Sequence, residues 1–495
     1  MKKFLLYMCF AAALVGCAKE LNPTTVDNAS GNPVKFEINV QETKAAKDTW
    51  ENGDIIYVFF KGLEEKYLVL TYWDGSWDND PGAGEFVESD FSSLDGESLT
   101  LTAVHFPDVV DVKFADGKFS FSQNGNPVYS YYLCQKDAEY TFKKATVSAS
   151  LHMGKPANIS LFRIAGISEN VPDHTLACSL VQPLACTAVT VDGEITEELA
   201  QPGARVNGVK DNDGVIFSGH LTTTESANYT FVLANNDNIF TLSKERELAH
   251  VMRYNMPTPN SGEWSIQNVS DLYVDLGLGV KWATCNLGAA TESEGGAYFA
   301  WGEVLGELAQ NGQLARKYSF KNYYWLADEG RTGTSGDAAY ITRYTFADGE
   351  TTGIWYDGDK FVGDGVNSLQ GYNKIDDAAY AALGGKFRMP TYSDWEDLIH
   401  NCDWQWVEKQ DGYSNPGCRV TSRKQGYTDK SIFLPAMRMY DSKGISYHED
   451  IIGWYWSSTL AGKSQTASVG AFGPETKHSS GIPRACGMPI RPVSD

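Results

Sequence analysis

The sequence predicts a mostly β protein in which two tandem β-sandwich domains precede an α+β domain. Short runs of alternating apolar and polar residues, such as 34–40, fill the first half of the chain without a helical stripe of useful length. Asp-Gly turn signals separate these runs, as expected for an all-β region. Nine of the thirteen tryptophans follow residue 270, which indicates that a different core begins there.

The N-terminus predicts secretion and attachment to a membrane. Two lysines and an apolar run over residues 4–15 make a signal peptide at 1–16, because the run is too short to span a bilayer as a permanent helix. It ends in Leu-Val-Gly-Cys, which resembles the bacterial lipobox, so Cys17 is expected to carry acyl chains such as palmitate. Residues 17–33 are polar and read as a lipidated tether. An ordinary cleaved signal followed by a chance cysteine is the alternative.

The net charge limits the possible partners, and the cysteine count limits the possible disulfides. The net charge of −22 repels nucleic acid and anionic lipid, which argues against both as partners. Seven of the nine cysteines remain after the signal cysteine and Cys17 are set aside, so at least one thiol is free or intermolecular. A disulfide between Cys285 and Cys486 is one possibility, and buried free cysteines are the other.

The two predicted sandwiches cover residues 34–135 and 136–267. Within the first, the segment Thr43-Lys44-Ala45 through Trp50-Glu51-Asn52-Gly53-Asp54 to Ile56-Tyr57-Val58-Phe59 resembles the start of fimbrillin-family proteins. The resemblance implies lipoprotein precursors built from two tandem β-sandwiches, many of which are pilus subunits. Fimbrillins assemble by strand exchange, often after an Arg-specific cut, and this chain has no arginine before Arg163. That departure favours a tip or accessory subunit, or a free-standing adhesin, over an ordinary mid-fibre subunit.

Two helices are predicted in the third domain, which covers residues 270–495. Thr391 begins a capping box with Asp394, and the apolar residues that follow over 395–402 fall on one helical face. A shorter helix is expected over 376–383, where the next two residues are glycines that stop it.

Four blocks recur in a recognisable order in this domain: Val274–Leu278 with Lys281–Thr284, Gly385–Thr391, Tyr455–Ser458 and Ile490–Val493. Together they resemble the Fibrobacter succinogenes major paralogous domain, a family of bacterial surface domains similar in fold to C-type lectins and formylglycine-generating enzymes. The resemblance implies that these blocks form a folding skeleton. It also implies that loops before the final Arg-Pro-Val, here 459–483, form an exposed face for binding.

Candidate ligand-binding side chains lie in and before that exposed face. Trp454 and Tyr455 could form a platform for stacking a sugar, although the resembling family keeps this block in its core. The segment 460–483 places polar side chains among small residues, which suits ligand binding. An ordinary solvated loop without a ligand is the alternative. Its candidate residues are Lys463, Gln465, Glu475, Lys477 and His478.

The sequence indicates no catalytic residue, metal ligand set or cofactor. Asp357, Asp359 and Asp364 offer oxygen ligands of a calcium kind, but turn chemistry explains aspartates beside glycines equally well. The common hydrolase, nucleotide-binding and zinc motifs are absent, and His400 falls at a polar helix position. A formylglycine-generating-like oxidase is the enzymatic alternative, and it would need a pair of neighbouring reactive cysteines.

We therefore expect a non-enzymatic lipoprotein adhesin of the outer membrane, exposed on the cell surface or in a fimbrium. The sandwiches would form a stalk, and a C-type-lectin-like head would bind an unidentified glycan or protein ligand. A tip or accessory subunit of a fimbrillin-type pilus, with other pilus subunits as partners, is the alternative.

Overall fold

The computed structural model describes residues 32–41, 50–94, 99–156, 158–167, 174–211, 213–310, 313–327, 340–346, 356–357, 360–361, 363–409, 412–441, 443–446, 452–475 and 477–495. The signal peptide, Cys17, residues 18–31 of the tether and Thr43–Ala45 lie outside these ranges. The described chain is mostly β, which confirms the predicted fold class. No helix in these ranges has the length and apolarity needed to cross a membrane.

The first sandwich is built on a seven-stranded sheet in which the inner strand β2 is buried on both faces. The sheet has the order β1-β9-β8-β5-β2-β3-β4. Phe59 of β2 packs on Phe119 on one face, and Phe60 packs on Phe91 of the short helix α2 (Glu88–Ser92) on the other. The sequence analysis missed this helix because five residues are too few to show a helical period. The strands are β1 (Lys35–Val40), β2 (Ile55–Phe60), β3 (Tyr67–Trp73), β4 (Ser76–Ala83), β5 (Thr100–His105), β8 (Leu133–Lys143) and β9 (Thr146–Leu151).

A four-stranded sheet with the order β14-β13-β7-β6 faces this sheet and shares one apolar core with it. Two of its strands, β13 and β14, come from the region predicted to be the second sandwich. The predicted boundary between 135 and 136 is wrong, because it cuts β8, and because β9 also belongs to the first sheet. The chain thus leaves the first sandwich after β9 and returns to complete it. The strands are β6 (Asp111–Ala115), β7 (Lys118–Ser122), β13 (Leu184–Thr190) and β14 (Ile195–Leu199).

The second sandwich encloses its own core between two sheets. One has the order β12-β17-β10-β20, with β16 also pairing β17, and the other has the order β15-β11-β18-β19-β21. Phe162 of β10 packs on Phe231 of β18 across the core. The strands are β10 (Ser160–Ala165), β11 (Thr175–Cys178), β12 (Val181–Gln182), β15 (Val206–Asn207), β16 (Val209–Asp211), β17 (Gly214–Leu221), β18 (Ala227–Ala234), β19 (Asn238–Arg246), β20 (Arg253–Met256) and β21 (Ser265–Asn268).

The four sequence blocks meet in the core of the C-terminal domain, as predicted. Strands from the first, second and fourth blocks form one sheet, in which Val493 lies opposite both Trp282 and Arg388. The third block joins them through Trp395, whose ring packs on Trp282 and on Tyr455. The sheet has the order β22-β23-β37-β28, with β22 (Tyr273–Val274), β23 (Lys281–Ala283), β28 (Phe387–Arg388) and β37 (Val493–Ser494).

In the described ranges, the rest of this domain consists of small sheets, two α-helices and three 3₁₀ helices. Helix α4 (Tyr392–Asn401) has the predicted capping box, and α3 (Ala378–Leu383) ends at Gly384, whose φ of 66° suits glycine. The segment predicted as a loop over 460–483 is instead largely two strands, β35 and β36. The remaining elements are η1 (Val269–Leu272), η2 (Phe320–Asn322), η6 (Gly371–Asp376), β24 (Ala297–Tyr298), β25 (Glu307–Leu308), β26 (Tyr356–Asp357), β27 (Lys360–Phe361), β29 (Cys402–Val407), β30 (Gly417–Ser422), β31 (Ser431–Pro435), β32 (Met439–Asp441), β33 (Gly444–Ser446), β34 (Gly453–Ala461), β35 (Lys463–Phe472) and β36 (Lys477–Pro483).

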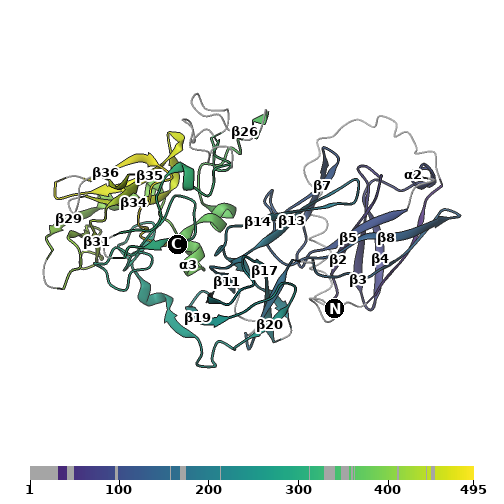
Figure 1. Cartoon of the computed structure of the whole chain (residues 1–495), viewed down its shortest axis with the longest axis horizontal. Helices are drawn as coiled ribbons and strands as arrows, with labels where there is room; N and C mark the ends of the chain where they lie inside the picture. Colours follow the sequence, from purple (N-terminus) through teal and green to yellow (C-terminus); the bar gives the residue numbers. More distant parts are fainter. Residues whose placement is uncertain are drawn as a thin grey trace.

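The three parts follow one another along the long axis of the molecule (Figure 1). Strands β34, β35 and β36 lie toward the end opposite the seven-stranded sheet, and the second sandwich lies between them. Helix α3 faces the second sandwich, where it approaches β18. The C-terminal domain is therefore docked onto the second sandwich through α3.

Candidate ligand-binding cleft and the domain interface

An open cleft of about 630 Å³ lies between the start of α4 and the β34–β35–β36 sheet. Its volume falls in the range of small-molecule sites, about 300–1,000 Å³. The side chains around it are small or polar, and none carries a charge at neutral pH. They are Ser368, Gln370, Thr391, Tyr392, Ser393, Thr459, Leu460, Ala461, Gly462, Ser468, Ser480 and Gly481.

Backbone hydrogen bonds fix the walls of this cleft around β34. The register of β34 against β35 shifts between Trp456 and Leu460, and such a bulge redirects the chain locally. Ser458 then donates its N–H to the Pro390 carbonyl (2.7 Å) just before α4, and accepts from the Leu369 N–H (2.9 Å). The Tyr-Trp-Ser-Ser block thereby holds both the 366–370 segment and the α4 start in place.

The first turn of α4 contributes the exposed rim of the cleft. The Thr391 hydroxyl accepts from the Asp394 N–H (3.0 Å), and the Asp394 carboxylate accepts from the Thr391 N–H (2.7 Å). Arg388 donates to the same carboxylate at 2.7 Å, so this charge is paired. Tyr392, the first helical residue, is 43% exposed, and it is the exposed aromatic ring at this cleft.

None of the ligand-contact residues predicted from sequence lines the cleft. Tyr455 is wrong as a surface contact, because its side chain is fully buried and its hydroxyl donates to the Pro435 carbonyl at 2.7 Å. Trp454 is partly buried, with its ring 6.1 Å from that of His478. Lys477 is exposed, and its ammonium lies 5.7 Å from the centre of the Trp404 ring.

The other predicted contacts lie at the turns of the same sheet. Lys463 is exposed where β35 begins, one residue after Gly462 of the cleft. Gln465 is partly buried, and its carbonyl accepts from the Arg484 N–H (3.0 Å). Glu475 is exposed between β35 and β36. The structure therefore does not bring these residues together in one site.

The sequence analysis missed the residues that do line the cleft. Thr391 and the two residues after it were recognised only as a helix start, and Ser368 and Gln370 gave no local signal. The Ser457–Ser458 pair was recognised as framework, but its bulge depends on pairing with β35. A rule that looks for hydroxyl residues at a helix start beside such a block would have found the Thr391–Ser393 rim.

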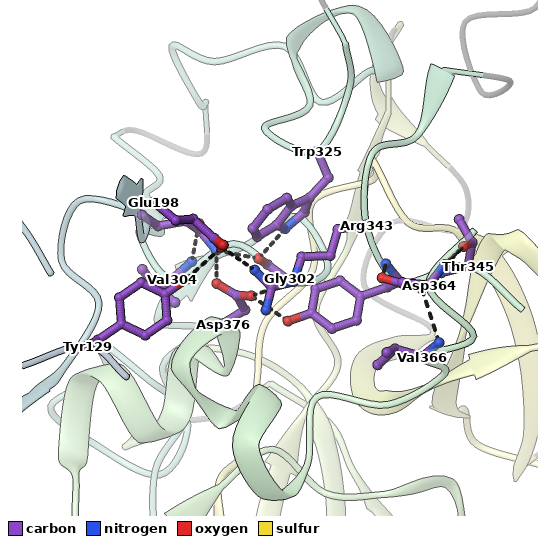
Figure 2. Close-up of polar contacts among 12 residues, drawn as sticks. Tyr129, Glu198, Gly302, Val304, Trp325, Arg343, Thr345, Asp364, Val366 and Asp376 are labelled. Carbon is purple, nitrogen blue, oxygen red and sulfur yellow. Dashed lines mark hydrogen bonds and ion pairs between the residues drawn. The ribbon is translucent and has the colours of Figure 1, made fainter. Parts of the chain in front are cut away.

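A second polar cluster joins the C-terminal domain to the sandwiches and is shown in Figure 2. Gln201 donates to the carboxylate of the buried Asp376 (2.9 Å) and to the Gly302 carbonyl (2.7 Å), and it accepts from the Val304 N–H (3.2 Å). Tyr344 donates its hydroxyl to the other oxygen of Asp376. Because the polar groups of this cluster are hydrogen-bonded to one another, the cluster is better explained as a domain interface than as a reaction centre.

The cluster extends from Asp376 to the surface through Arg343. The Arg343 guanidinium lies 3.6 Å from Asp376 and 3.5 Å from Glu198 of β14, which also accepts from the Tyr129 hydroxyl (2.7 Å). Burial raises the pKa of Asp376, and Arg343 opposes that rise. Charge from the first sandwich thus meets charge from the C-terminal domain (Figure 2).

Neither the calcium alternative nor the possible disulfide is supported. Asp359 lies outside the described residues, as does the side chain of Asp357, whereas Asp364 accepts from the Tyr344 N–H (2.6 Å). No group of three or more metal-ligating side chains occurs within the described ranges. Cys285 and Cys486 are both free thiols, so the possible bond between them is absent, and His400 is exposed as predicted.

Asp377 gives the fold a predicted pH dependence. It caps α3, accepting from the Ala379 (2.8 Å), Tyr380 (3.1 Å) and Met389 (2.8 Å) N–H groups. Burial raises its pKa from 3.8 to about 6, against the opposing effect of these donors. The raised pKa means that protonated Asp377 is favoured in the folded state over the unfolded state. Its contribution to the free energy of unfolding is therefore fully present below about pH 4 and is lost as the pH rises through 6.

Asp377→Asn is expected to remove that slope, which amounts to about 3 kcal/mol of unfolding free energy between pH 4 and 7. The asparagine oxygen can still accept from the first two N–H groups, so the helix cap remains. Urea denaturation at several pH values measures the slope, with Asp397→Asn on the exposed face of α4 as the control. An Asn variant that retains the wild-type slope would contradict the assignment.

Comparison with known proteins yields no family for this chain. The sequence matches no protein-family model and no curated protein. Among solved structures, it is similar to a fimbrial protein from Bacteroides ovatus, over 94% of this chain and 100% of that one, with 10% identity and a TM-score of 0.24. It is also similar to the fimbrial anchor protein Mfa2 from Porphyromonas gingivalis, over 48% of this chain and 96% of that one, with 12% identity and a TM-score of 0.21.

Proposed function

We propose that this protein is a non-enzymatic adhesin, anchored in the outer membrane through lipid on Cys17, whose C-terminal domain binds a ligand on another surface. The observation that carries the proposal is the open, uncharged cleft beside Tyr392, whose walls are held by backbone hydrogen bonds. The sandwiches act as a stalk that holds this C-type-lectin-like head away from the membrane. The residues around the cleft offer binding groups but no nucleophile activated by a base.

The state of the cysteines supports binding over thiol oxidation. A reactive cysteine must be a thiolate, yet burial raises the pKa of Cys402 to about 11 and those of Cys418 and Cys486 to about 12. In the β29–β30 ladder, Cys402 lies opposite Ser422 and Cys418 lies opposite Trp406, so the two are not cross-strand partners. The formylglycine-generating-like oxidase is therefore the weaker proposal.

A tip or accessory pilus subunit is the second candidate, and the position of β1 favours it. Among the described strands, β1 lies at the edge of its sheet and pairs with β9 alone, in parallel, while Phe36 packs on Phe86 of the core. Its loss would open an apolar groove suited to a strand from a partner. The strand β37, in contrast, lies between β23 and β28 inside a sheet, which suits a tip better than a mid-fibre position.

Cell adhesion measured with matched variants tests the adhesin proposal. Cells that express the wild-type chain are expected to adhere to a surface that deletion cells do not bind, and Cys17→Ser cells to lose adhesion and release the protein. The full chain purified in detergent should still bind that surface with either residue at position 17. Unchanged adhesion after deletion would contradict the proposal, and loss of surface fibres in electron micrographs would favour the pilus role.

A further inference from the structure

We infer that the cleft beside α4 binds a neutral saccharide, without calcium and without a charged contact. This inference rests on the proposed adhesin function and specifies the class of ligand. Seven of the twelve side chains around the cleft carry a hydroxyl group, one carries an amide, and none is charged at neutral pH. Hydroxyl and amide groups both donate and accept hydrogen bonds, which is what alternating sugar hydroxyls require.

The cleft also offers apolar surface where a sugar ring needs it. Tyr392 exposes 43% of its surface at the rim, and the Ala461 methyl group adds a small aliphatic surface. An aromatic ring with a polar tip suits the C–H face of a pyranose and one of its hydroxyls together. Because α4 and β34 are tied by backbone bonds, little conformational freedom is lost when a ligand binds.

Unmet hydrogen-bonding capacity lies at the same wall. Ser480 lines the cleft, and its hydroxyl is buried without a partner among the described residues. Buried polar groups are normally paired, so this hydroxyl indicates hydrogen-bonding capacity left over at the wall.

A peptide fits the cleft less well than a saccharide. Extended peptides are held mainly through the backbone groups of an open strand edge. Here two backbone N–H groups along the wall are already used, since the Leu369 N–H donates to the Ser458 carbonyl and the Leu460 N–H donates to the Asn367 carbonyl, each at 2.9 Å. The wall therefore presents mainly side-chain hydroxyls.

An acidic sugar would find its charge partners in a neighbouring pocket and not in this cleft. That pocket, of about 460 Å³, also includes Gln370, and it contains Lys374, Lys386 and Arg388, with Asp495 beside them. A charged ligand in the neutral cleft would lose hydration without a compensating charge. The two pockets thus predict different salt dependence. Salt screens binding between opposite charges in the neighbouring pocket, whereas binding in the neutral cleft should change little.

A glycan array probed with the detergent-purified full chain tests the inference, using neutral and acidic oligosaccharides at low and high salt, with and without a calcium chelator. We expect binding to neutral glycans that changes less than twofold with salt or chelator. Tyr392→Ala should weaken it at least tenfold. Tyr324→Ala, at a tyrosine of similar exposure (38%) away from the cleft, should leave it unchanged.

Other outcomes would overturn the inference in recognisable ways. Binding only to acidic glycans, reduced by salt and by Lys386→Ala, would place the ligand in the neighbouring pocket. A protein ligand lost in Tyr392→Ala would replace the saccharide class while leaving the adhesin function intact. Both proposals would be overturned by two results together: the purified chain binds no ligand on the array, and cells in which the gene is deleted adhere as well as the wild type.

Discussion

Replacing Arg205 by methionine is expected to separate unfolding of the C-terminal domain from unfolding of the second sandwich. Arg205 is buried where the two meet, and its guanidinium donates to the Tyr380 (3.0 Å) and Ala381 (2.7 Å) carbonyls of α3. It also donates to the Thr175 (3.1 Å) and Val232 (2.9 Å) carbonyls of the sandwich. Methionine fills much of the space but leaves four carbonyls without this donor.

The expected loss is about 3 kcal/mol or more, because each hydrogen bond made by a charged group contributes about 1.5–3 kcal/mol. Burial lowers the pKa of Arg205 to about 10, so it remains charged at neutral pH and binds through carbonyl dipoles. Gly384 packs tightly here as well, since a Cβ atom there would lie 2.6 Å from the Ala234 methyl group. The two domains therefore pack too closely at this point for a small shift to form new hydrogen bonds in place of those of Arg205.

Calorimetry of the full chain checks this prediction. The wild type should unfold its second sandwich and C-terminal domain together, whereas Arg205→Met should show an earlier, separate transition. Arg246→Met, at a partly exposed arginine at the end of β19, is the control and should behave as the wild type. A single unshifted transition in Arg205→Met would show that the interface does not couple the two domains.

The features predicted correctly from sequence are those with local causes. The capping box at Thr391 and the glycine after Leu383 fix the ends of α4 and α3 within a few residues of the chain. The recurring Trp and Gly blocks also predicted a shared core, and their strands do meet in one sheet. Such signals depend on neighbours in the sequence and so can be read from it.

The features that were predicted wrongly, or missed, depend on distant partners. Strands β13 and β14 are short, and nothing in their sequences specifies that β13 pairs with β7 of the first sandwich. Gln201 and Arg205 look like residues of a polar turn until the C-terminal domain covers them. Segment 460–483 is rich in Gly and Ser, which favours a loop prediction, but pairing with β34 makes it a sheet.

Replacing Arg491 by leucine is expected to destabilise the core of the C-terminal domain by about 3 kcal/mol or more. This residue belongs to the last sequence block, and its side chain is fully buried. Its guanidinium donates to Asn286 Oδ1 (2.7 Å) and to the Thr284 (2.9 Å) and Phe433 (3.0 Å) carbonyls. It thereby ties the end of the chain to the first block and to β31.

Arg491→Lys should be nearly as damaging as the leucine variant, because one ammonium group cannot reach acceptors arranged around a planar fork. Urea denaturation of the full chain, followed by tryptophan fluorescence, measures both variants. Arg423→Leu is the matched control, since this arginine of the same domain is half-exposed and its ion pair with Asp403 is worth at most about 1 kcal/mol. Equal midpoints for the Arg491 and Arg423 variants would show that the final block is not part of the framework, and the cleft walls that depend on that framework would need another explanation.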